Sequence, residues 1–113
     1  MSFHNYVYVG PYAELTLNAR FDPYEILGDD MREPLREDRG WEARTIRMVP
    51  NRDHPYTFDL GHEKYGVTPI TPEQVARGLE QFLTDYREAI DRLSEQAQVD
   101  QVQILWGAIS YYS

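Results

Sequence analysis

The sequence contains no cysteine. Disulfides, thiolate nucleophiles and cysteine-based zinc or iron–sulfur sites are therefore excluded, and a reducing compartment fits best. A signal-peptide pattern is also missing, and the longest uncharged apolar run, ILWGAI, is too short to span a bilayer. These absences predict a soluble cytoplasmic protein that does not enter a membrane.

Positive charge is scarce. Eleven basic residues stand against nineteen acidic ones, which gives a net charge of −8, and Lys64 is the single lysine. Such a charge repels nucleic-acid phosphate and anionic membranes and favours basic partners. We therefore expect no direct binding to nucleic acid, and a protein partner with a basic or hydrophobic surface.

The first and last parts of the chain have the patterns of strands. Residues 12–21 alternate strictly, with Leu15 and Leu17 on one side and Glu14 on the other, as in a half-buried strand. Residues 3–9 and 101–112 are apolar on both sides, which is typical of strands inside a sheet. The pair Gly10-Pro11 predicts a corner between the first two strands.

The middle of the chain is rich in turn signals. Residues 22–40 predict two short helical turns, the first capped by Asp22 and ended by Gly28. This segment is either ordered by packing or mobile. Residues 41–49 and 56–60 predict a hairpin, followed by a loop.

The clearest element is a helix. It begins at Thr71-Pro72-Glu73-Gln74, a capping box with proline at the first helical position. Apolar residues then recur at steps of three and four, which predicts one amphipathic helix over about 72–97. The apolar stripe consists of Val75, Leu79, Phe82, Leu83, Tyr86, Ile90, Leu93 and Ala97.

Together these elements predict a single α+β domain over residues 1–113. We expect an antiparallel or mixed sheet of about five strands, with the long helix packed on one face. The terminal strands need cover on both faces, so we place them side by side in the middle of the sheet. The second face of the sheet then needs residues 22–40 or a partner to cover its tyrosines.

Two surfaces are candidates for binding a partner. Tyrosine tolerates half-burial and is common at interfaces, and a patch of tyrosines forms if the terminal strands are neighbours. The tyrosines concerned are Tyr6, Tyr8, Tyr12, Tyr111 and Tyr112. The second surface is a row of carboxylates on one flank of the helix: Glu73, Glu80, Glu88, Asp91 and Glu95. Such a row either meets a basic partner or is a solvated face with local ion pairs, such as Glu88 with Arg92.

The histidines form no pattern typical of a catalytic or metal-binding site. His4, His54 and His62 are scattered, and no spacing typical of a metal site joins them. A small hydrolase or nuclease using His54 and His62 is a less favoured alternative, since it needs a cationic cleft for phosphate. We therefore predict no catalytic residue, no metal, no cofactor and no enzyme.

The opening segment YVYVGPYAEL resembles the start of small bacterial and phage-type proteins that begin Y-x-V-G-P-Y-x-E. The matching positions are Tyr6 or Tyr8, Val9, Gly10, Pro11, Tyr12 and Glu14. Members of that group often carry cysteine pairs of a zinc-ribbon type, which this chain lacks. The resemblance therefore implies no function.

The function that fits these features is that of a small acidic, non-enzymatic protein-binding module. Inhibitors, immunity proteins and anti-defence proteins of phages or mobile elements have this character. In such a module the tyrosines supply affinity and the carboxylates steer the encounter. The alternative is a homo-oligomeric structural or accessory protein whose tyrosine-rich face is buried against another copy.

Overall fold

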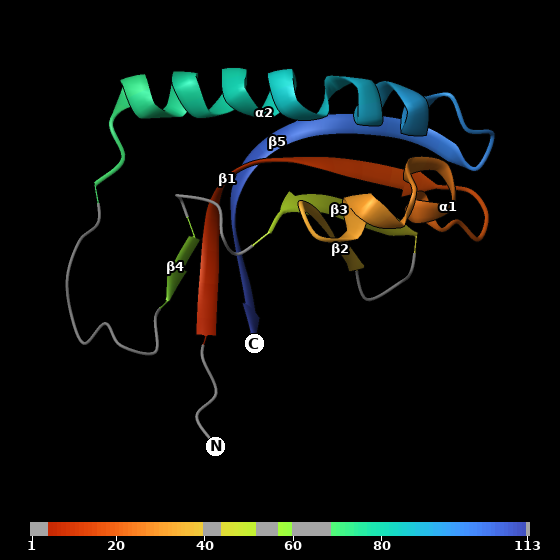
Figure 1. Cartoon of the computed structure of the whole chain (residues 1–113), viewed down its shortest axis with the longest axis horizontal. Helices are drawn as coiled ribbons and strands as arrows, with labels where there is room; N and C mark the ends of the chain where they lie inside the picture. The colour runs from red at the N-terminus through yellow and green to blue at the C-terminus, as the bar shows by residue number, and fades with distance from the viewer. Residues whose placement is uncertain (1–4, 40–43, 52–56, 60–68, 113) are drawn as a thin grey trace.

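The computed structural model describes residues 5–39, 44–51, 57–59 and 69–112. The described elements are β1 (Asn5–Leu17), α1 (Pro23–Leu27), a 3-10 turn η1 (Asp29–Arg32), β2 (Leu35–Arg39), β3 (Thr45–Pro50), β4 (Thr57–Asp59), α2 (Pro72–Ser94) and β5 (Val99–Tyr112) (Figure 1). One long helix and an antiparallel sheet confirm the predicted α+β class.

The sheet is organised around β1. The sheet contains five strands: four follow the hydrogen-bonded path β2-β3-β1-β4, and β5 lies off this path, paired with β1. The β1–β5 ladder is the longest, from Asn5 opposite Tyr112 to Leu17 opposite Val99. The other edge of β1 is shared, because residues 6–8 pair with β4 and residues 13–16 pair with β3. The prediction that the terminal strands are neighbours is therefore confirmed.

Gly10-Pro11 was predicted to separate two strands, and this is wrong, because β1 continues through the pair as a single strand. Figure 1 shows β1 and β5 bending together, with β4 beside one arm of β1 and β3 beside the other. The bend therefore lies between residues 8 and 13 of β1. Gly10 faces Gly107 within this stretch, so two residues without a Cβ meet where the strands curve.

The core lies between α2, α1 and one face of the sheet. In β1, Ala13 and Leu15 are fully buried, and Ile46 and Met48 of β3 lie beside them in the register. The helices contribute Tyr24, Leu27, Phe82, Ile90 and Leu93. The predicted apolar stripe of α2 packs on the sheet in its middle and second half, where Phe82, Ile90 and Leu93 are buried. Its two ends do not: Val75 is 37% exposed, and Ala97 is exposed and lies beyond the helix.

Hydrogen bonds between residues close in the sequence mark the start of α2 and the turn that follows its end. The capping box is confirmed: the Gln74 amide donates to Thr71 Oγ1 at 3.1 Å, and the Thr71 amide donates to Gln74 Oε1 at 2.8 Å. The helix ends at Ser94, three residues before the predicted end. The amide of Val99 donates to the carbonyl of Gln96 in the turn that leads into β5.

Residues 22–39 are ordered by packing and differ from the prediction in their second half. Asp22 caps α1 and Gly28 follows its last residue, with φ of +94°, as the turn signals predict. The second predicted helical turn is wrong, because Leu35–Arg39 forms β2. Leu35 is fully buried on the sheet, and this burial outweighs the turn signals around it.

Two strand predictions also need correction. The expected hairpin of residues 41–49 with 56–60 is wrong, since β3 pairs with β1 and β2 while β4 pairs with β1. The C-terminal strand was expected inside the sheet. In the part of the chain that the structure describes, β5 pairs with β1 alone and lies at the edge.

Candidate functional site

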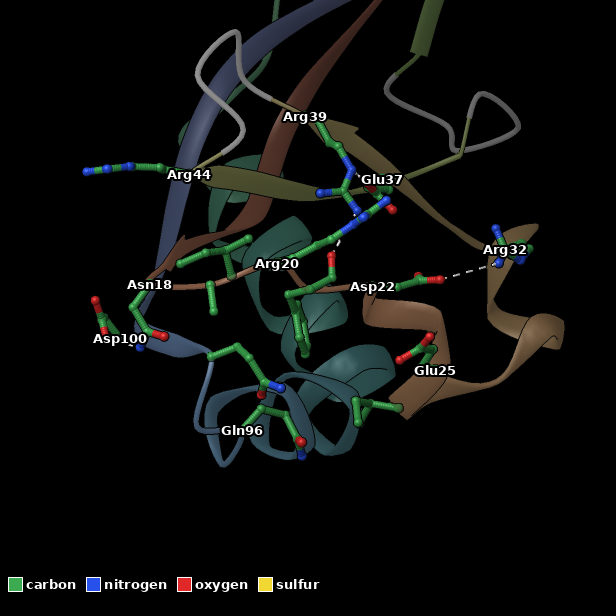
Figure 2. Close-up of a pocket in the computed structure, with 15 residues that line it drawn as sticks. Asn18, Arg20, Asp22, Glu25, Arg32, Glu37, Arg39, Arg44, Gln96 and Asp100 are labelled. Atoms are coloured by element: carbon green, nitrogen blue, oxygen red, sulfur yellow. Dashed lines mark hydrogen bonds and ion pairs between the residues drawn. The ribbon is translucent and has the colours of Figure 1, made fainter.

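A pocket of about 1320 Å³ lies where β1 ends, between α1, the β2–β3 pair and the turn that leads into β5. Its apolar lining comes from Leu17, Phe21 and Ile26. Figure 2 shows the polar side chains around it coming from segments that are far apart in the sequence. The pocket is thus formed where several connections of the fold meet.

Most carboxylates of the pocket already serve the fold. Asp22 accepts a hydrogen bond from the amide of Tyr24 at 3.0 Å, which starts α1. Glu37 forms an ion pair with Arg39. Asp100 accepts a 2.5 Å hydrogen bond from the Asn18 amide, which ties the end of β1 to the start of β5. These groups hold the walls of the pocket together.

The four arginines of the pocket divide into two groups. Arg39 donates to the carbonyl of Phe21 at 2.9 Å, and Arg32 lies 3.0 Å from Asp29 and stacks on Tyr24. The hydrogen bond with Asp29 raises the pKa of Arg32. Arg20 and Arg44 form no ion pair with any other described residue. In Figure 2 Arg20 reaches toward Arg39, whereas Arg44 points away.

The pocket can therefore offer the Arg20 guanidinium to an anion. Its four arginines are balanced by four acids, Asp22, Glu25, Glu37 and Asp100, so the lining as a whole is neutral. A neutral lining gives no strong preference for the charge of a ligand.

The outer face of α2 is the second candidate site. Glu73, Glu80, Glu88, Asp91 and Glu95 are all exposed, as the sequence predicts. They lie on the side of the helix opposite to its buried residues, because their helical positions differ from those of Phe82 and Leu93 by about half a turn. The row is therefore a flat, solvent-facing strip along the length of α2.

Local ion pairs neutralise only the beginning of this strip. Glu73 pairs with Arg77 at 2.5 Å. The predicted pair of Glu88 with Arg92 is wrong, because Arg92 donates instead to the carbonyl of Ile26 at 2.5 Å and so joins α2 to α1. Among the described residues, the remaining four carboxylates of the strip have no ion-pair partner.

The predicted tyrosine patch is only partly assembled. The backbones of Tyr6 and Tyr111 face each other in the β1–β5 ladder, and Tyr112 faces Asn5, but these side chains lie outside the described ones. Tyr8 is fully buried, and its hydroxyl donates to the carbonyl of Pro11 at 2.7 Å. Tyr12 is half-buried. Tyr8 is thus a structural residue, and Tyr12 is the one described side chain of the patch that meets solvent.

Burial changes the acidity of three tyrosines. Desolvation raises the pKa of Tyr8 strongly, and the neighbouring Tyr86 adds to this effect. Burial also raises the pKa of Tyr24 and of Tyr86, whose hydroxyls donate to the carbonyls of Leu35 and Pro34. All three shifts favour the neutral phenol, which is a donor to backbone and a poor proton acceptor.

The three histidines, His4, His54 and His62, lie outside the described residues, and so does the hydrolase or nuclease site predicted as an alternative on His54 and His62. Among the residues that are described, no group of three or more histidine, cysteine or acidic side chains is arranged to hold a metal ion. Likewise, none of the helices described has the length and apolar character needed to cross a membrane.

Comparison with models of protein families, with curated proteins and with solved structures finds no match to this chain. The resemblance of the opening segment therefore stays a prediction. Any function has to be argued from the surfaces themselves.

Sequence reasoning missed the pocket. Its walls come from the end of β1, from β2 and from the turn before β5, and the sequence had predicted a helical turn where β2 lies. The isolated acid Asp22 beside Pro23 was the one signal that marked part of the site, through its capping role.

Proposed function

We propose that this protein is a non-enzymatic, cytoplasmic protein-binding module that docks on a basic surface of another protein through the outer face of α2. The observation that carries the proposal is the set of carboxylates on this face that lack an ion-pair partner among the described residues. They are Glu80, Glu88, Asp91 and Glu95. The site is thus a rigid strip on a single helix.

The strip suits recognition of a basic surface for two reasons. From Glu80 to Glu95 it extends about 22 Å at the helical rise of 1.5 Å per residue, which is comparable to one side of a standard interface. The net charge of −8 adds a long-range field that speeds encounter with a cationic partner. Arg92 is turned toward α1 and does not neutralise Glu88.

The exposed helix face also makes the proposal testable without disturbing the core. In a first variant the four carboxylates are replaced by their amides: Glu80→Gln, Glu88→Gln, Asp91→Asn and Glu95→Gln. A control variant loses four exposed acids of the α1–η1 region, Glu25→Gln, Asp29→Asn, Asp30→Asn and Glu33→Gln. Both variants carry the same net charge, so they separate the strip from the overall field.

Each form serves as bait for affinity capture from an extract of the source organism, and a retained protein is then purified for binding kinetics. We expect wild type and control to retain a basic protein that the helix variant loses. The association rate should fall markedly from low to high salt, because screening weakens steering. A partner that binds the helix variant as well as wild type would contradict the proposal.

A further inference from the structure

The sequence pattern of β5 disagrees with its position in the sheet. Both of its faces carry apolar residues, with Val102, Ile104 and Trp106 on one side and Leu105 and Ile109 on the other. Such a pattern is typical of a strand that has neighbours and cover on every side. Yet none of the residues from Asp100 to Ser110 is buried, whereas β1 has six buried residues between Tyr8 and Leu17.

The edge of β5 that faces away from β1 has no strand beside it in the described part of the chain. Every second backbone amide and carbonyl along a strand points to each side, so an edge of this length presents a row of backbone donors and acceptors. The mean strand is far shorter than the 14 residues of β5. This edge is therefore a long template for a further strand.

Natural edge strands usually carry devices that prevent pairing, such as lysine, proline or an inward-pointing charge. From Gln101 to Tyr112 the strand contains no charged residue and no proline. The one charge of β5 is Asp100, next to its start. Two antiparallel copies of this edge would hence bring no pair of like charges together along their shared ladder.

We infer that β5 pairs with β5 of a second copy of this chain, in antiparallel orientation, so that the sheet continues across a two-fold axis. A second copy fits the edge better than an unrelated strand because β5 is bent (Figure 1). With the axis near Gly107, which faces Gly10 in the bend, both copies curve at the same place and toward the same side. The pairing then gives β5 a strand along both edges, as is typical of a strand inside a sheet.

This dimer responds to salt in the opposite way to the basic partner of α2. Each copy carries a net charge of −8, so the two copies repel each other, and screening removes part of this repulsion. Sedimentation velocity over a range of protein concentrations, at low and at high salt, measures the effect. We expect the dimer fraction to rise with concentration and with salt.

A matched pair of variants locates the interface. Ala108 on β5 and Ala76 on α2 are both exposed alanines. Ala108→Glu places two new carboxylates near the axis and should raise the dimer dissociation constant at least tenfold, whereas Ala76→Glu adds the same charge far from it and should change the constant little. Circular dichroism checks that both variants keep the wild-type fold.

The absence of cysteine allows a second measurement. Ala108→Cys and Ala76→Cys each carry a single thiol, and a short bismaleimide joins two copies only where the thiols are close. We expect crosslinked dimers from Ala108→Cys alone. A monomer at every concentration and salt, a dimer that salt dissociates, a dimer unaffected by Ala108→Glu, or crosslinking at Ala76→Cys alone would each overturn the inference.

Discussion

β1 and β5 are the two longest strands, and both read as interior strands, yet their surroundings differ. β1 has β5 on one edge and β3 and β4 along parts of the other, and Tyr8, Ala13 and Leu15 are fully buried. β5 has β1 alone among its described neighbours. Its apolar side chains are at most half-buried from Val102 to Ile109.

This difference shows what an alternation pattern records. The pattern indicates which faces of a strand have apolar side chains that are to be buried. It does not indicate whether the residues that bury them belong to the same chain or to another one. β1 has α2 packed on it and strands along both edges, with β5 on one and β3 and β4 on the other. For β5 the described chain supplies one neighbour, and the inferred second copy supplies the other.

The largest effect is expected when one leucine of β1 and one leucine of β5 are each replaced by alanine. Leu15→Ala removes a fully buried side chain of β1 and should lower the free energy of unfolding by about 2–5 kcal/mol. Leu105→Ala on β5 removes a half-buried one and should cost about 1 kcal/mol in dilute protein. Urea unfolding of both variants measures the difference. Equal losses would contradict the comparison.

A smaller effect should appear at alkaline pH. The folded-state pKa of Tyr8 is raised by burial, so above the ordinary tyrosine pKa of about 10 the unfolded chain binds fewer protons than the folded one. Stability is therefore full below about pH 10 and falls as the pH rises further, by up to about 1.4 kcal/mol per pH unit for one such group.

Tyr8→Phe should reduce the slope of this loss and, at neutral pH, cost about 1 kcal/mol through the hydrogen bond to Pro11. Tyr12→Phe is the matched control from the same strand, since its ring is half-buried. Urea unfolding at neutral and alkaline pH checks both variants. An unchanged slope in Tyr8→Phe would show that Tyr8 ionises freely in the folded state.

Local signals in the sequence predicted the elements that depend on local interactions. The capping box at Thr71 and the periodic stripe set α2, and Asp22 with Pro23 set α1. The pairing of β1 with β5 followed from their shared need for cover. Strands that depend on contacts between distant residues were not predicted. A helical turn was expected where β2 lies, and the burial of Leu35 on the sheet decides for the strand.

The candidate sites were predictable to different degrees. The exposed strip of α2 followed directly from helical spacing, but the turning of Arg92 toward Ile26 depends on where α1 packs. The tyrosine patch failed at Tyr8 because the bend at Gly10 buries that side chain: the Tyr8 hydroxyl lies 2.6 Å from where a Cβ of residue 10 would be. Neither fact has a signature in the local sequence.

Amide hydrogen exchange tests the central claim about β1 and β5 most directly. Amides of β1 from Ala13 to Thr16 have strands on both sides and should exchange slowly under all conditions. In dilute protein at low salt, every second amide of β5 from Ile104 to Ser110 should exchange fast. In concentrated protein at high salt these amides should become slow as well. An alternating pattern in β5 that stays the same at every concentration would contradict the account.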